Sequence, residues 1–188
     1  MTTLNIARTL ARSQVNGPGE RFVIWAQGCS LRCPGCWNPD TWAKKSRVLV
    51  SVDELSQAIF DTPGIEGVTL TGGEPFEQAE GFGALADIVR ARNMSVMIFT
   101  GYNPDEFDSR NQRRLVERCD ILVAGRYVQS RTVHGQPWLG SANQQVHYLT
   151  DRYTPARQRA ECEFHIHEDG RLVLTGFPAP ELQDITPA

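Results

Sequence analysis

The pattern of apolar and polar positions first picks out four short apolar runs. They lie at residues 21–28, 67–70, 95–99 and 120–124 and are rich in β-branched and aromatic residues. Runs of this length and composition, bounded by polar or turn-forming residues, are typical of buried strands. The sequence therefore predicts four strands.

Amphipathic stretches lie between these runs. Ser51 and Glu54 match a capping box, and the apolar residues at 52, 55 and 59 repeat with the period of a helix. Apolar residues at 82, 85, 86 and 89 predict a second helix. A third helix is expected to start near Asn103-Pro104, with Pro in its first turn.

Strands that alternate with helices favour a parallel α/β sheet, in which functional loops gather at the carboxyl ends of the strands. Four units are too few for a closed eight-stranded barrel, so we predict a partial (βα) barrel. We expect one domain over residues 1–188, with its core at about 14–150. A C-terminal β-hairpin is expected at about 160–178, with Asp169-Gly170 as its turn.

Composition narrows the class of protein. The chain has 188 residues, 40% of them apolar, and a net charge of −3, which does not favour non-specific binding to nucleic acid or to an anionic membrane. The N-terminus lacks the pattern of a signal peptide, and the sequence has no apolar run of membrane-spanning length. We expect a cytoplasmic protein whose cysteines stay reduced.

Three of the five cysteines fall within eight residues. Cys29, Cys33 and Cys36 have the spacing C-x3-C-x2-C and directly follow the first predicted strand. A structural zinc site needs four ligands, usually in two pairs, whereas three thiolates can hold a four-iron cluster and leave one iron open. The spacing favours a cluster over zinc and leaves both possible.

The remaining candidate metal ligands are weaker. Cys119 lies before an apolar strand and Cys162 lies before the predicted hairpin, so we interpret both as structural thiols. His165 and His167 share one face of a strand and are more typical of surface histidines than of ligands. Arginines at 110, 113, 114 and 118 follow helical spacing and predict a solvated helix face.

The segment Thr71–Pro75, "TGGEP", follows the second predicted strand. Adjacent glycines allow the backbone to approach a ligand closely, and Glu74 supplies an acceptor for a cationic group such as an ammonium. Alone, the segment also fits a plain turn before a helix. Its position one βα unit after the cysteines makes it informative.

Together, C-x3-C-x2-C and GGEP resemble the radical S-adenosylmethionine (SAM) superfamily. "CPGCWNPDTW" (33–42), "TGY" (100–102) and "DILVAGRYVQ" (120–129) are similar to the glycyl-radical enzyme activating family, and most of all to the small activators of anaerobic ribonucleoside-triphosphate reductase. The resemblance covers roughly residues 14–150. It leaves the hairpin unexplained.

The resemblance implies roles for individual residues. Cys29, Cys33 and Cys36 would hold a 4Fe–4S cluster, whose open iron would chelate the amino and carboxylate groups of SAM. The SAM contacts that it implies, apart from Cys36, are Gly35 and Trp37 on the adenine side, Asn38 as organiser of the loop, Gly72, Gly73 and Glu74 at the ammonium group, and more weakly Thr100 and Asn143.

The reaction implied is reductive cleavage of SAM to methionine and a 5′-deoxyadenosyl radical. That radical would take a hydrogen atom from a glycine of a partner enzyme, with the electron supplied by a flavodoxin-like or ferredoxin-like donor. The chain would thus be an oxidoreductase with no catalytic residue beyond the cluster. Two alternatives stay open: a small radical SAM enzyme that modifies a peptide or small molecule, and a non-catalytic iron–sulfur or zinc module.

Overall fold

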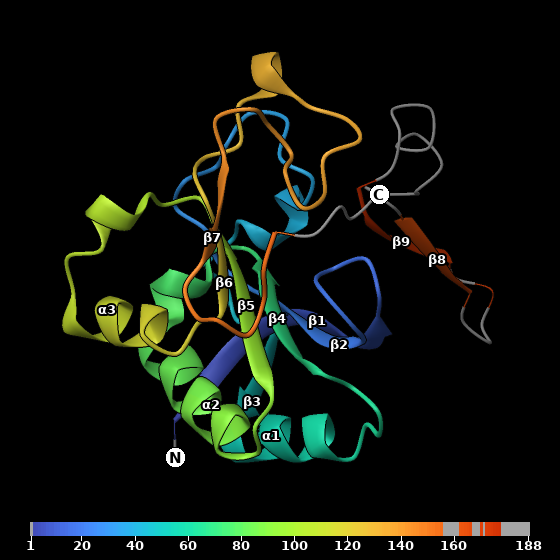
Figure 1. Ribbon diagram of the computed structural model, residues 1–188, viewed down its shortest axis with the longest axis vertical. Coiled ribbons are helices and arrows are strands. Elements are labelled where there is room, and N and C mark those ends of the chain that lie inside the picture. The colour runs from blue at the N-terminus through green and yellow to red at the C-terminus, as the bar shows by residue number, and fades with distance from the viewer. Residues whose placement is uncertain (1, 156–161, 167–169, 171, 178–188) are drawn as a thin grey trace.

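Seven strands form one mixed sheet in a computed structural model that describes residues 2–155, 162–166, 170 and 172–177 (Figure 1). Their spatial order is β3-β1-β2-β4-β5-β6-β7. The strands are β1 (Thr3–Ser13), β2 (Arg21–Ala26), β3 (Val48–Ser51), β4 (Gly67–Gly72), β5 (Ser95–Thr100), β6 (Ile121–Ala124) and β7 (Gln145–Tyr148).

The four strands predicted from the apolar runs form the middle of this sheet. β2, β4, β5 and β6 pair in parallel, whereas β1, β3 and β7 are antiparallel to their neighbours. The parallel register places the carboxyl ends of the middle strands along one edge, which is where the loops of interest begin. The sheet is an α/β sheet as expected.

Three helices cover one face of the sheet: α1 (Val52–Phe60), α2 (Ala79–Ala91) and α3 (Arg110–Val116). The capping box at the start of α1 is confirmed, because Ser51 and Glu54 each bond the other's backbone N–H. The third helix starts later than predicted. Pro104 opens a short 3-10 turn (Pro104–Glu106), and α3 begins at Arg110 with Ser109 as its N-cap, since Ser109 and Gln112 form a second capping box.

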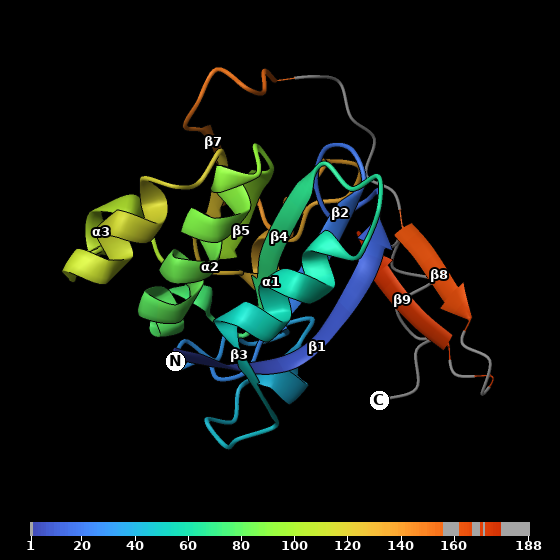
Figure 2. The same cartoon turned by 90° about the horizontal axis from the view of Figure 1, so that it is seen from below.

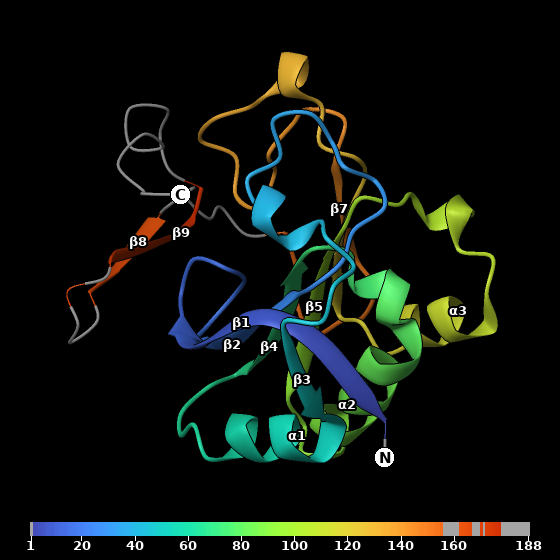
Figure 3. The same ribbon diagram turned by 180° about the vertical axis from the view of Figure 1, so that it is seen from behind.

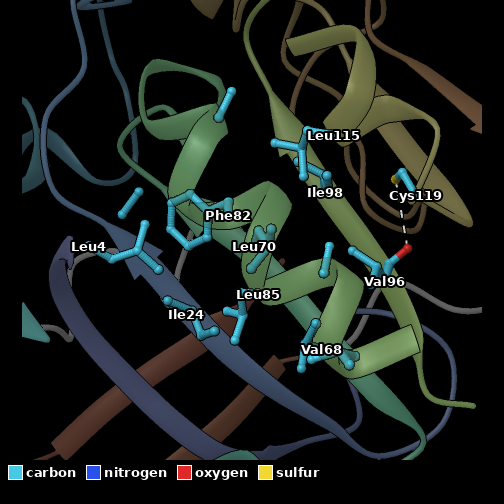
Figure 4. Packing of buried hydrophobic residues seen from close by; sticks show 14 of the residues in the cluster. Leu4, Ile24, Val68, Leu70, Phe82, Leu85, Val96, Ile98, Leu115 and Cys119 are labelled. Atoms are coloured by element: carbon cyan, nitrogen blue, oxygen red, sulfur yellow. Dashed lines mark hydrogen bonds between the residues drawn. The ribbon is translucent and has the colours of Figure 1, made fainter. Parts of the chain in front are cut away.

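The main core lies between these helices and the sheet (Figure 4). Ile24, Leu70 and Ile98 project from neighbouring strands onto Phe82 and Leu85 of α2, and all five are buried. Cys119 is buried at the edge of this core, as expected for a structural thiol, and its Sγ lies 3.7 Å from the carbonyl oxygen of Val96. Its burial raises the pKa of the thiol.

The opposite face of the sheet carries alternate residues of the same strands, and no α-helix of the described residues covers it, so we call it the helix-free face. Met97, Ile121 and Val123 form an apolar cluster with Trp138 there. Next to it, the guanidinium of Arg21 is fully buried and donates to Thr69 Oγ1 and Ser95 Oγ, among other acceptors. These hydrogen bonds offset the cost of burying the charge.

β1 was not predicted. Its eleven residues include Arg8 and Arg12, and its pairing with β2 shifts register twice, so apolar and polar residues do not alternate regularly along it. Its antiparallel pairing and that of β7 make the sheet mixed, and the predicted partial barrel is not confirmed.

The predicted C-terminal hairpin is confirmed in its two strands, β8 (Cys162–Ile166) and β9 (Leu172–Gly176). They form a separate two-stranded sheet beside the main one (Figure 2). Within the predicted turn, Asp169 lies outside the described residues, as does His167. His165 Nε2 lies 3.3 Å from Glu163 Oε2 on the same strand. Among the described residues, no helix is long and apolar enough to cross a membrane.

Candidate active site

The cysteine loop leaves the carboxyl end of β2 and returns to the same place (Figure 3). Gly28 N–H donates to the Thr41 carbonyl at 2.7 Å, and Cys29 N–H donates to the Trp42 carbonyl at 3.1 Å. Thr41 is completely buried beneath the loop. Residues 28–42 therefore form a loop whose two ends are hydrogen-bonded to each other at the carboxyl end of β2.

The three thiols lie on this loop in different surroundings. Cys29 is buried at its base, while Cys33 and Cys36 are partly buried, and all three are free thiols. Burial raises the pKa of Cys29 and of Cys33, and for Cys33 a backbone donor at Tyr127 and the charge of Arg126 oppose that shift. The backbone N–H of Asn38 donates to Cys36 Sγ at 3.4 Å. Such donors stabilise a thiolate ligand.

In the part of the chain that the structure describes, no group of three or more His, Cys, Asp or Glu side chains is arranged to hold a metal ion. All three thiols lie on one short loop, between residues 28 and 42. Three cysteine thiols and backbone N–H donors are the donor set that an iron–sulfur cluster uses. The residues present therefore fit such a cluster.

The glycines of the TGGEP segment lie against the base of the cysteine loop. Gly72 pairs with Ala26 at the end of β2. Gly73 N–H donates to the Ala26 carbonyl, and Glu74 N–H donates to the Gly28 carbonyl, both at 2.8 Å. A Cβ at Gly73 would lie 2.4 Å from the Gly28 oxygen, so only glycine fits there. The two motifs singled out in the sequence are thus hydrogen-bonded to each other.

Glu74 is buried, and three protein groups donate to its carboxylate. They are Phe76 N–H at 3.0 Å, Thr100 Oγ1 at 2.8 Å and Gly101 N–H at 2.9 Å. Burial nevertheless raises the pKa of Glu74 to about 7. Glu74 and Thr100, both predicted as ligand contacts, are therefore brought together and bond to each other, which joins the loop after β4 to the loop after β5.

The remaining predicted contacts lie on the cysteine loop. Asn38 accepts from Arg8 Nη2 and, through its carbonyl, from Thr41, so it connects the loop to β1 and to its own base. Gly35 has a φ of 74°, a left-handed conformation that favours glycine. Trp37 is 37% exposed, and its ring lies 5.6 Å from that of Phe177.

Two charged residues of the site were missed in the sequence. Glu77 accepts from Ser30 N–H and forms an ion pair with Lys44 at 2.8 Å, so it holds both ends of the cysteine loop. Arg126, which follows β6, forms a two-point ion pair with Glu106 and lies close enough to Cys33 to affect its pKa. Glu77 follows Glu74 by three residues, and this closeness to the GGE segment is the feature of the sequence that points to Glu77 as part of the site.

Asn143, the weaker of the predicted contacts, lies beside Arg126. Its Nδ2 donates to the Arg126 carbonyl at 2.7 Å, while its Oδ1 is buried and has no hydrogen-bond partner among the described residues. A buried acceptor without a donor carries a free-energy cost of about 1–3 kcal/mol. Asn143 is therefore connected to the loop after β6, and its Oδ1 has no protein donor among the described residues.

Comparisons with known proteins identify the family of this chain. Residues 15–147 match the model of the family described as "4Fe-4S single cluster domain". The chain is 32% identical over 144 residues to the anaerobic ribonucleoside-triphosphate reductase-activating protein of Vibrio cholerae, a match that spans 72% of this chain and 92% of that protein. The Escherichia coli K12 protein of the same name is 33% identical over 143 residues, with the same shares covered.

The phage T4 protein of that name is 30% identical over 154 residues, which is 79% of this chain and 96% of the phage protein. A crystal structure of QueE from Escherichia coli matches 63% of this chain and 68% of its own with a TM-score of 0.40 and 19% identity. The resemblance inferred from the two motifs is confirmed by the sequence matches. The chain belongs to the 4Fe–4S single cluster domain family and, within it, to the anaerobic ribonucleoside-triphosphate reductase-activating proteins.

Proposed function

We propose that this protein is a radical SAM enzyme that cleaves SAM reductively at a 4Fe–4S cluster and installs a glycyl radical on an anaerobic ribonucleotide reductase. The observation that carries the proposal is the direct bonding of the GGE segment to the base of the cysteine loop, through Ala26 and Gly28. It supports a cluster and a SAM-binding turn that would lie side by side, where proximity would favour electron transfer.

Cys29, Cys33 and Cys36 would hold the cluster, which when bound supplies the electron that breaks the C5′–S bond of SAM and so yields the radical that takes the glycine hydrogen atom. Asn38 and Gly35 would shape the loop around it, since the former donates to Cys36 and the latter provides the left-handed turn.

For the ammonium group of SAM, we propose a different assignment from the one that the resemblance implies. The carboxylate of Glu74 already accepts hydrogen bonds from three protein donors. We therefore assign the ammonium group of SAM to the backbone at Gly72 and Gly73, where the absence of side chains allows close approach. Glu74 and Thr100 would act by positioning that backbone. Trp37 would line the adenine side.

The partner and the electron donor follow from the same proposal. The relatives are named as activators of a reductase, so the partner would be a glycyl-radical protein of that kind, and the donor a flavodoxin-like or ferredoxin-like protein. Both would meet this chain in the cytoplasm. The four parallel strands would form the wall of a partial barrel of the radical SAM type, within a single domain spanning residues 1–188.

The first experiment tests SAM cleavage. Protein reconstituted anaerobically with iron and sulfide, then given dithionite and SAM, should release 5′-deoxyadenosine and methionine. Cys33→Ala should abolish both products, while Cys162→Ala, which removes a partly buried thiol on β8 and not on the loop, should retain them. If no product forms and about one zinc binds per chain, the chain is a structural metal module and the proposal is wrong.

The second experiment tests the partner. Incubation of the active enzyme with anaerobic ribonucleotide reductase should give a glycyl-radical signal in electron paramagnetic resonance. Exposure to oxygen should then cleave the partner at one glycine, which mass spectrometry would locate. SAM cleavage without any radical on the reductase would favour the alternative of a peptide or small-molecule substrate.

A further inference from the structure

A residue of the C-terminal hairpin segment reaches the candidate site. Phe177 directly follows β9, and its ring lies 5.6 Å from that of Trp37 on the cysteine loop and 6.2 Å from that of Phe99 on β5. It also packs on the apolar cluster around Met97 on the helix-free face. Phe177 lies outside residues 15–147, the segment that matches the family model.

Polar contacts fix the hairpin that carries Phe177. Thr175, on β9, is buried and accepts from Asn16 Nδ2 at 2.8 Å. Glu163, on β8, accepts from the Gln14 backbone N–H at 2.7 Å. Both contacts attach the hairpin to the loop between β1 and β2, so it is held at two points close to the start of β2.

Gly176 then turns the chain toward the site. Its φ is 96°, in the left-handed region that side chains disfavour. The turn comes one residue after the buried Thr175 and one residue before Phe177. The direction of Phe177 is therefore set by the local backbone as well as by the packing of its ring.

We propose that Phe177 is a positioning residue of the SAM site: it holds the indole of Trp37 toward β5 and closes the helix-free side of the pocket for the adenosyl group. The inference rests on the function proposed above. Trp37 remains 37% exposed with Phe177 in place, so its indole depends on few neighbours for its orientation. Aromatic pairs at this separation are stabilising, and a fixed indole binds a flat base at a lower entropic cost.

The contact itself can be tested without cofactor. The fluorescence of Trp37 is obtained as the difference between the wild-type chain and Trp37→Phe, and its quenching by acrylamide is measured. Phe177→Ala, made with and without Trp37→Phe, should increase the quenching of Trp37, whereas Phe177→Tyr, which keeps a ring, should not. Phe164→Ala is the matched control, because Phe164 lies on β8 of the same hairpin and is 46% exposed.

The role in binding is tested on the reconstituted enzyme. Loss of one aromatic contact should raise the dissociation constant and KM for SAM about 2- to 12-fold, since such pairs contribute about 0.5–1.5 kcal/mol. The kcat for SAM cleavage should change less, and Phe177→Tyr should restore the wild-type KM. Phe164→Ala should leave both constants unchanged.

The outcomes are distinct. Unchanged quenching in Phe177→Ala would overturn the contact, and increased quenching with an unchanged KM would reduce Phe177 to a packing residue. If the wild-type enzyme neither binds nor cleaves SAM, the proposed function fails and this role fails with it, while quenching still reports the contact. Circular dichroism of each variant excludes loss of the fold as the cause.

Discussion

Glu74 allows a prediction that can be worked out quantitatively. Its carboxyl group is fully buried, and burial raises its pKa from an ordinary 4.5 to about 7, although three donors favour the ionised form. Between these two values, the folded protein keeps a proton that the unfolded chain has released. Stability from this group is therefore complete below pH 4.5 and is lost as the pH rises through about 7.

The size of the effect follows from the shift. Each pH unit within this window reduces the free energy of unfolding by about 1.4 kcal/mol, so the decline from pH 5 to pH 8 should be about 2–3 kcal/mol. Glu74→Gln removes the titration. Its amide nitrogen would face the Gly101 N–H, which adds a cost that is the same at every pH.

The assay is urea unfolding of the metal-free protein at several pH values from 5 to 8. The difference in free energy of unfolding between wild type and Glu74→Gln should fall steadily by the amount stated, because titrations elsewhere cancel. Thr100→Val removes a donor to the ionised carboxylate, so its decline should extend to higher pH. A difference that is flat, or that rises with pH, would refute the reasoning.

Four further substitutions have expected outcomes that urea unfolding can measure. Gly73→Ala should cost about 1–3 kcal/mol because its Cβ would collide with the Gly28 carbonyl, whereas Gly83→Ala, on α2 with open space around it, should stabilise by about 0.5–1 kcal/mol. Arg21→Met should cost about 3 kcal/mol or more, because it leaves buried acceptors without donors. Ser51→Ala should cost about 1 kcal/mol through loss of the capping box of α1, and an unchanged midpoint would contradict the cap.

The middle strands of the sheet and the two motifs can be predicted from the sequence. β2, β4, β5 and β6 are mostly buried strands in which apolar residues predominate, a pattern typical of the parallel middle strands of an α/β sheet. Loops at their carboxyl ends then had to meet at one edge. For this reason the sequence alone predicts that the cysteine loop and the GGE segment lie next to each other.

Other parts could not be predicted because they depend on long-range contacts. β1 pairs with β2 through a register that shifts twice, and no local periodicity records that pairing. The carboxylate of Glu74 accepts hydrogen bonds from Phe76, Thr100 and Gly101, and the two donors at the end of β5 lie far from Glu74 in the chain. The contact between Phe177 and Trp37 joins residues far apart in the chain, and nothing in either local sequence indicates it.

The link between the two motifs has a physical origin in strand register. Gly72 lies opposite Ala26, so the residues that follow each strand are adjacent whatever the lengths of the intervening helix and loops. Both glycines are required by this packing before any ligand binds, since side chains there would collide with the Trp25 and Gly28 backbone. A GGE segment on a strand that does not neighbour the cysteine strand would meet neither requirement. The two motifs together therefore indicate that the strand before the cysteine loop and the strand before the GGE segment pair in parallel.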